Sequence, residues 1–364
     1  MGCRDFPERK DTPIPAEVLD DLFFADRNEP AWHNILKQGL DAERRYSAVE
    51  VIAALGGPAY LKLPLQTIAQ RQDGSHIEVP AYAIVRTPFG SHKDEAMMGL
   101  VKEGYHLVTP TDAADMWDLK VGKHIETAAF LREGKLFMMG CKLDPVDVRG
   151  DAVLTYLNMH IWMDGLTAST AITSPVKEVC MNTVQMAHQM AKQSARFVHD
   201  QYILVRMGRW MGDVVDVAEH GLPALAEAMR HLADYRLQNP RAEVLHVLTA
   251  AYPAPARPEP DPYLGKDYAD LREKKWQQEA RLITDRRSAA LELFKGRGRG
   301  MDSLAMAGTA WGLYNAVTEV EDWRGGSKGP VSDARASAIL VGERAEAKQR
   351  AWTAAVEVAS GALA

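Results

Sequence analysis

The sequence predicts an α+β fold in which a mostly antiparallel sheet of the N-terminal half packs against long helices of a helical C-terminal half. Short runs of alternating apolar and polar residues, separated by turn residues, fill the chain up to about residue 174. Beyond that point the apolar residues recur at helical spacing. The chain has 364 residues, 46% hydrophobic and 25% charged, an ordinary globular composition able to bury a sizeable core.

For the N-terminal half, the sequence predicts a poorly ordered segment, two short helices and a sheet of about six or seven strands. Residues 1–30 are polar and interrupted by prolines, which is typical of a poorly ordered terminus. One helix is expected over residues 46–55, and a second is expected after Thr111 as its N-cap. The turn sequences Glu133-Gly134-Lys135 and Met163-Asp164-Gly165 predict hairpins. Strands are expected over residues 59–65, 78–87, 97–110, 125–132, 136–143, 153–162 and 166–173.

The helical half is expected to begin at a serine-proline pair. Ser174 is a good N-cap, and Pro175 suits the first helical position, so a helix is predicted from here to about Arg209. Cys180 falls on the apolar stripe of this helix, which indicates a small core residue rather than a nucleophile. No Ser-His-Asp or GxSxG arrangement accompanies it, so the sequence does not predict a catalytic elbow.

The remaining helices define the expected domain organisation. Helical patterns continue to about Ala251, with breaks near Gly221-Leu222-Pro223 and at Asn239-Pro240. We therefore expect an α+β core domain over residues 31–251, a proline-rich connector over 252–265, and a helical region over 266–364 that packs on the core. Within that last region, helices are predicted over residues 267–294, 303–323 and 333–359.

Basic residues gather in two segments although the net charge is −6. Residues 175–209 contain five Lys/Arg against two Asp/Glu, and residues 264–300 contain ten against six. Such segments can follow phosphates, with Tyr202, Trp210 and Trp276 available to stack on bases. Solvated helix faces with i,i+4 ion pairs are the alternative. The candidate nucleic-acid-binding residues are Lys177, Lys192, Arg196, Arg206, Arg209, Arg297 and Arg299.

Other classes of site find little support. The three cysteines form no CxxC pair and the histidines show no HxH or HExxH spacing, so no metal site and no cofactor are predicted. Asn315, Glu319 and Asp322 share one helical edge, which favours an exposed amphipathic face over a magnesium site. No signal-peptide pattern and no apolar run near eighteen residues occurs, so we expect a soluble protein of the bacterial cytoplasm without a membrane partner.

Eight short motifs occur in an order that resembles a known family. They are "AWHNILKQGL", Tyr82–Thr87, "GYHLVTP", "ETAAFLREG", "GDAVLTYL", "WMDG" with "PVKEVCMNTV", Arg196–His199 and Gly308–Glu319. The chain resembles, over roughly residues 32–358, the phage- and plasmid-encoded family called domain of unknown function 932. Three positions depart from the family pattern: Asn34 and Met163 replace an expected glycine and histidine, and Lys177 replaces an arginine. The loss of that histidine argues against a His-dependent hydrolase.

The resemblance implies DNA handling rather than a settled activity. Its order of elements is also similar to that of phage single-strand annealing proteins, which assemble into rings. We therefore expect a phage- or plasmid-encoded protein that binds single-stranded DNA, promotes annealing of strands in recombination or replication, and forms a homo-oligomer. The rival is an enzyme or nucleotide-binding protein, and a third reading is a non-catalytic structural or host-interaction protein. An enzyme or nucleotide-binding protein would gather the polar residues of the family motifs in one cleft. These residues are Trp32, His33, Asp164, Asn182, His199, Asn315 and Glu319.

Overall fold

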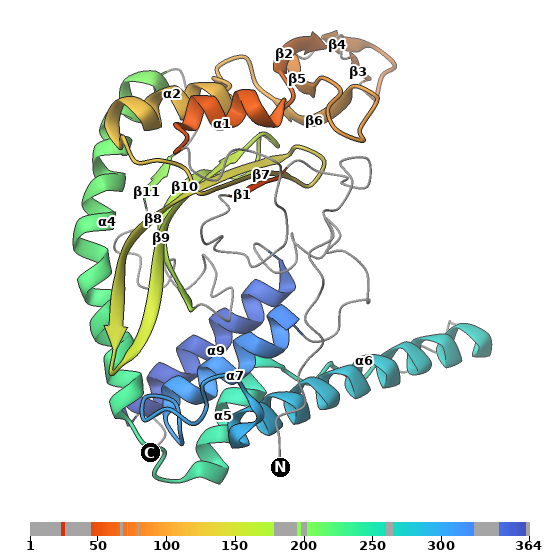
Figure 1. Ribbon diagram of the computed structural model, residues 1–364. Coiled ribbons are helices and arrows are strands. Elements are labelled where there is room, and N and C mark those ends of the chain that lie inside the picture. The colour runs from red at the N-terminus through yellow and green to blue at the C-terminus, as the bar shows by residue number, and fades with distance from the viewer. Residues whose placement is uncertain are drawn as a thin grey trace.

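The computed structural model describes residues 23–25, 45–65, 68–70, 72–78, 80–177, 195–197, 202–259, 265–323 and 342–361. The expected α+β class is confirmed, with antiparallel sheets in the N-terminal half and most helices in the C-terminal half (Figure 1). The strands are β1 (Phe23–Ala25), β2 (Tyr60–Leu65), β3 (Ile68–Gln70), β4 (His76–Glu78), β5 (Ala81–Arg86), β6 (Ala96–Val101), β7 (Thr127–Leu131), β8 (Leu136–Val148), β9 (Asp151–Trp162), β10 (Ser169–Lys177) and β11 (Ala195–Phe197). The helices are α1 (Ala48–Leu55), α2 (Pro110–Lys120), α4 (Ile203–Asp234), α5 (Pro240–Ala251), α6 (Lys266–Glu292), the π-helix η2 (Leu293–Arg297), α7 (Ala310–Trp323) and α9 (Glu343–Ala359).

The main sheet is antiparallel, and its strand order is β1-β7-β8-β9-β10-β11. Its centre is the long β8–β9 hairpin, closed by Arg149 and Gly150 with φ of 55° and 85°. Two consecutive positive φ angles give the turn whose twist matches that of the strands. The predicted turn at Glu133-Gly134-Lys135 is confirmed, because it joins β7 to β8.

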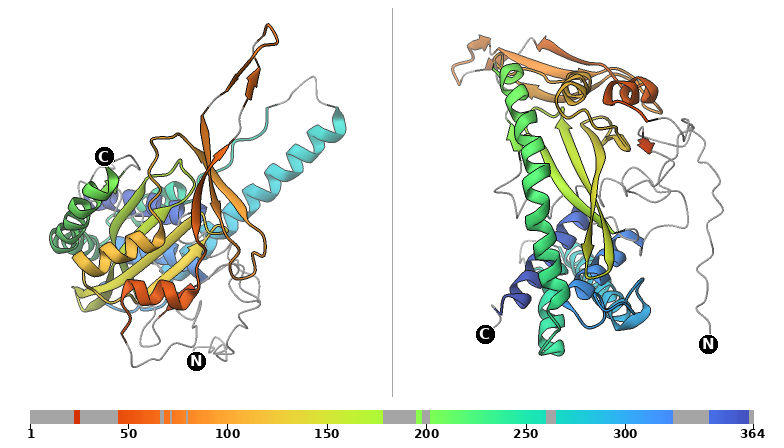
Figure 2. Two further views of the ribbon diagram at one scale, coloured as in Figure 1. Left: turned by 90° about the horizontal axis from the view of Figure 1, so that it is seen from above. Right: turned by 60° about the vertical axis from the view of Figure 1, so that its left-hand side comes forward.

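A smaller sheet, β2-β5-β6, lies at one end of the molecule. The chain continues from β2 through the two-stranded β3–β4 hairpin and returns to β5. This hairpin projects well away from the rest of the protein (Figure 2). Its tip is held by Asp73, whose carboxylate accepts hydrogen bonds from the backbone N–H and hydroxyl of Ser75. Both bonds favour the charged form and lower the pKa of Asp73.

Two separate apolar cores form on the two ends of the main sheet. The first core lies between α1, α2 and one face of β7–β9, where Trp117, Phe130 and Phe137 are buried. The second core lies among α4, α5, α7 and α9 and includes Trp311, Tyr314 and Trp352. The tip of the β8–β9 hairpin contributes to it through valines such as Val148. The second core thus joins residues from both sides of the proline-rich connector.

Helix α4 runs the length of the molecule and belongs to both cores (Figures 1 and 2). Its 32 residues span about 48 Å at the usual rise per residue. Ile203 and Trp210 at its N-terminal end pack in the first core, whereas Leu225 and Met229 pack in the second. The helix continues through Pro223, so the predicted break there is wrong. Burial of the residues that follow Pro223 outweighs the local cost of the proline.

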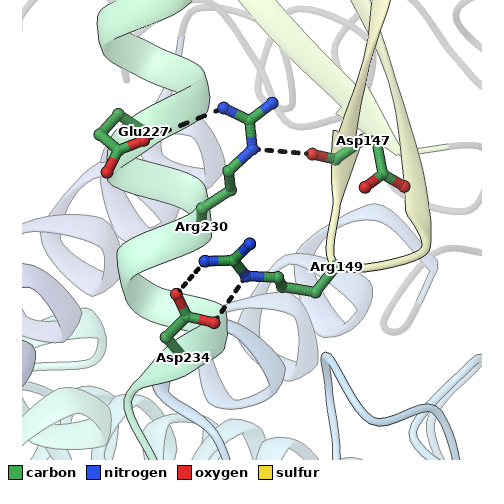
Figure 3. Close-up of polar contacts among 5 residues, drawn as sticks. All are labelled: Asp147, Arg149, Glu227, Arg230 and Asp234. Carbon is green, nitrogen blue, oxygen red and sulfur yellow. Dashed lines mark hydrogen bonds and ion pairs between the residues drawn. The ribbon is translucent and has the colours of Figure 1, made fainter.

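The hairpin tip is fastened to the C-terminal end of α4 (Figure 3). The guanidinium of Arg149 binds the carboxylate of Asp234 through two nitrogens, with Nε to Oδ1 at 2.7 Å. One turn earlier, Arg230 Nε donates to the carbonyl of Asp147 at 3.1 Å. The pairing with Arg149 lowers the pKa of Asp234. These contacts fix the two long elements to each other at the end remote from α1 and α2.

The predicted helix start at Ser174 is wrong. Ser174 and Pro175 lie in β10, opposite Tyr156 and Thr155 of β9. Proline lacks an N–H donor, and it is tolerated in a strand where one edge is open. Among the described residues, β11 pairs only with the first three of β10, Ser169 to Ala171, and none pairs with Pro175 on that side. Residues 178–194, which include Cys180, lie outside the described residues.

Two other helix boundaries differ from expectation. Helix α2 is capped by Thr109 rather than Thr111, with Pro110 at its first position and a reciprocal bond between Thr109 and Asp112. A capping box explains the earlier start, since it satisfies two backbone donors. Helix α7 starts at Ala310 rather than near residue 303, because Gly308, with φ of 69°, interrupts the helical backbone.

Candidate functional site

The candidate nucleic-acid-binding residues do not share one helix. Lys177 ends β10, Arg196 lies in the middle of β11, and Arg206 and Arg209 lie near the start of α4. Lys192 lies outside the described residues, as do Trp32, His33, Asn182 and His199. The helix predicted from Ser174 to about Arg209 is therefore not continuous, because strand β11 intervenes before α4 begins.

An exposed stripe remains on the first turns of α4. Tyr202, which immediately precedes the helix, and then Arg206 and Arg209 follow at spacings of four and three residues. This spacing puts the three side chains on one face. All three are exposed, and the guanidinium carbon of Arg206 lies 5.9 Å from the centre of the Tyr202 ring. Trp210, one turn after Arg206, borders the stripe and anchors the helix in the first core.

Arg196 belongs to the same end of the molecule, whereas Lys177 does not. Strand β11 pairs with the start of β10, with Arg196 opposite Thr170, and α4 packs against both strands. Lys177 lies seven residues further along β10, which corresponds to about 23 Å. The structure thus brings Arg196 near the α4 stripe and leaves Lys177 at the other end of the sheet.

Arg297 and Arg299, the two arginines separated by a glycine, lie beside the second core. From Arg206 to Leu225, an α4 residue of that core, the helix advances about 28 Å. The chain there leaves the π-helix η2 through Gly296, which has φ of 104°. Arg297 is exposed and pairs with Glu292 at 2.8 Å, and the backbone N–H of Arg299 donates to Glu319 at 3.0 Å. The loop is therefore attached to α7 rather than held free.

The polar edge of α7 is buried, so the expectation of an exposed face is wrong. Asn315, Glu319 and Asp322 are nearly inaccessible to solvent, because α4, α5, α6 and α9 surround the helix. The amide of Asn315 donates to the Trp311 carbonyl at 2.9 Å. Asp322 forms a fully buried ion pair with Lys348 of α9 at 2.6 Å. Each polar side chain of this edge thus has a partner within the fold.

Asp164 organises the turn between β9 and β10. Its carboxylate accepts bonds from the N–H groups of Leu166 and Thr167 and from the Thr167 hydroxyl, at 2.6 to 2.9 Å. The turn lies against β6 so closely that a Cβ on Gly99 would come 1.9 Å from the Asp164 carbonyl oxygen. Asp164 has a structural role in this turn, and the glycine permits the contact.

The structure does not bring Asp164 together with Asn315 and Glu319. Asp164 follows the end of β9, whereas Asp151 at its start accepts a bond from the Trp311 indole at 3.0 Å. The 13 residues between the two aspartates correspond to about 43 Å of strand. A single pocket of ordinary size cannot span that separation.

Sequence reasoning missed a buried polar row across the second face of the main sheet. Thr127, Gly140 and Asn158 are register partners on β7, β8 and β9, and His160 follows on the same face. A Cβ on Gly140 would lie 2.4 Å from Asn158 Oδ1 and 3.2 Å from Thr127 Oγ1. Gly140 therefore makes room for the amide and the hydroxyl. A glycine inside an otherwise bulky apolar strand was the signal for this close approach.

Metal and thiol chemistry find no site in the described part of the chain. The described residues contain no group of three His, Cys, Asp or Glu side chains placed to hold a metal ion. Cys141 is buried in the first core, and burial raises the pKa of its thiol to about 12. A thiol with that pKa is not a nucleophile at neutral pH. None of the described helices is both long enough and apolar enough to cross a bilayer.

Taken by fold, this is an α+β protein with two cores joined by a helix and a hairpin, and with an exposed Tyr-Arg-Arg stripe at one end. The model of the family described as domain of unknown function (DUF932) matches residues 97–352. Since the match covers well over half of the chain, the protein belongs to this family. Neither the curated proteins nor the solved structures gave a significant match.

Proposed function

We propose that this protein binds single-stranded DNA at the N-terminal end of α4. The observation that carries the proposal is the exposed stripe of Tyr202, Arg206 and Arg209, next to the strand that bears Arg196. Proteins that hold single strands combine cations for the phosphates with aromatic rings for the bases. The finer role, annealing of strands during recombination or replication of a phage or plasmid, extends the proposal and rests on the resemblance alone.

Binding of this kind needs no catalytic group. Phosphate contacts gain free energy by releasing counterions, and the stacked base adds a term that depends little on sequence. The one-cleft enzyme is not proposed, because Asp164 lies far from Asn315 and Glu319. Arg297 and Arg299 lie at the second core and are not part of the proposed DNA-binding stripe on α4. Their role in DNA binding stays a prediction.

The test is a titration of a fluorescently labelled oligo(dT) followed by anisotropy at several salt concentrations. Arg206→Gln with Arg209→Gln should weaken binding and reduce the slope of log K against log salt by about 1.4, two phosphate contacts on a single strand. Tyr202→Ala should weaken binding by roughly 1–3 kcal/mol with little change in slope.

A matched control is Arg241→Gln with Lys274→Gln, which removes the same charge from exposed positions on α5 and α6. The control should bind like the unmodified protein. Equal losses in both double variants would show that net charge alone matters and that the α4 stripe has no special role. Absence of binding at low salt would refute the function itself.

A further inference from the structure

The outer face of the β2-β5-β6 sheet is entirely apolar. The register pairs define three rows across the strands, and directly paired residues point to the same side of a sheet. The two complete rows on the outer side are Leu61–Val85–Met97 and Leu63–Ala83–Leu100. The third row is Leu65–Ala81. No charged or hydrogen-bonding side chain occurs among these eight outward positions.

The opposite face shows the pattern expected of a sheet that packs on a protein core. There, Tyr60 donates a hydrogen bond to the Gly134 carbonyl. Arg86 binds the carbonyls of Glu133 and Asp94 at 2.7 and 2.9 Å. The polar groups of this sheet thus lie on the covered face, beside the buried Ile84 and Val101, and none lies on the outer face. An antiparallel sheet with only one covered face normally carries polar side chains on its open face.

Four of the eight outer side chains are exposed to solvent, whereas Ala83 in the middle strand is buried. Leu61, Leu63, Met97 and Leu100 keep 45, 42, 58 and 55% of their surface exposed. Together they present on the order of 400 Å² of contiguous apolar surface, within the range that marks functional patches on soluble proteins. One partner of a standard interface contributes about 800 Å², of which a little over half is apolar. The patch therefore supplies most of the apolar area for one such interface.

We propose that a second copy of this chain packs on the outer face of β2-β5-β6, sheet against sheet. The face is uncharged, so it can pack on a second copy of itself across a two-fold axis, and two sheet faces can close at about 10 Å. The exposed charges that flank β6 have both signs: Lys93, Asp94 and Glu95 before it, and Lys102 and Glu103 after it. A rim of both signs can pair with itself but offers no net attraction to a nucleic acid or an anionic membrane. This surface is separate from the α4 stripe, and the proposal does not rest on DNA binding.

The experiment measures the mass of the full chain by sedimentation equilibrium at micromolar concentrations. The unmodified protein should sediment at twice the 40.3 kDa of one chain. Leu63→Glu with Leu100→Glu should give a single-chain mass, because like charges would face each other across the axis. Leu304→Glu is the control: Leu304 is more exposed than any residue of the patch but lies beside α7, so its mass should not change.

A mixing experiment separates a direct contact from a folding defect. Leu63→Lys with Leu100→Lys should also give single chains, and an equimolar mixture of the Glu and Lys variants should regain the doubled mass. If the central pairs prevent folding, Met97→Glu and Met97→Lys provide the same comparison at the most exposed position. A single-chain mass for the unmodified protein up to about 100 μM, or a doubled mass in both charged variants, would overturn the proposal.

Discussion

Two buried cations, Arg86 beside the first core and Lys348 beside the second, are held in different ways. In the first, the guanidinium of Arg86 is satisfied by neutral backbone carbonyls of two loops and lies over the Phe89 ring, 5.0 Å from its centre. In the second, the ammonium of Lys348 is satisfied by the carboxylate of Asp322. The stability of a cation held by backbone carbonyls depends on the conformation of the loops. The stability of a cation held by a carboxylate depends on that one side chain. The first arrangement should tolerate loss of a single side chain better than the second.

The largest effect is therefore expected in the second core. Lys348→Ala should lower the free energy of unfolding by roughly 3–5 kcal/mol, because it leaves the Asp322 carboxylate buried without its counter-ion. Urea unfolding followed by circular dichroism measures the loss. Lys348→Met with Asp322→Leu should recover most of it. A double variant no better than Lys348→Ala would mean that packing, and not charge, limits this site.

The close approach of Gly99 to the backbone of the Asp164 turn allows a test of packing beside the first core. Gly99→Ala should cost about 1–3 kcal/mol, since its Cβ would meet the backbone of the Asp164 turn at 1.9 Å. Gly312→Ala makes the same perturbation beside the second core, where the Cβ would meet the Met306 carbonyl at 1.9 Å. Thermal unfolding should show both losses. Gly104→Ala is the control, with no heavy atom within 4 Å of the new methyl group.

The cap of α2 gives a smaller effect. Thr109→Ala should cost about 1 kcal/mol, because its hydroxyl accepts from the Asp112 N–H and donates to the Asp112 carboxylate. Thr111→Ala, at the cap that the sequence suggested, should be nearly neutral since this side chain is exposed inside the helix. Comparison of the two melting temperatures is sufficient. The reverse order would place the helix start two residues later.

The smallest effect is expected at the Arg149–Asp234 contact, which solvent screens. Because Arg149 lowers the pKa of Asp234 below its usual 3.8, the ionised carboxylate stabilises the fold above that pH. The contribution is lost as pH falls through the lowered pKa. Asp234→Asn should slightly reduce the melting temperature at pH 7 and leave it unchanged near pH 2. A constant difference at both pH values would indicate a role other than charge.

The sequence predicted the sheet better than the helices that carry the candidate site. Turn residues and period-two alternation located both β7–β8 and β9–β10 hairpins, since these signals are local. Ser174-Pro175 carries a helix-start signature, but pairing of these residues with Tyr156 and Thr155 of β9, a tertiary feature, places them in a strand. Likewise, the spacing of Asn315, Glu319 and Asp322 is that of a solvated edge. Only the surrounding helices, which are distant in sequence, reveal that this edge is buried.

The sharing of α4 and the β8–β9 hairpin between the cores has a consequence for dissecting the protein. A cut in α4 would deprive each core of part of its lining, and a cut at the hairpin tip would remove Val146, Val148 and Val153 from the second core. No fragment made at these points would fold alone, so the two cores should melt in one cooperative transition. By contrast, the β3–β4 hairpin projects away from the rest of the protein, and residues 72–75 at its tip are exposed (Figure 2). This tip is a place where the described chain can be interrupted, or fused to a reporter, without cutting α4 or the β8–β9 hairpin.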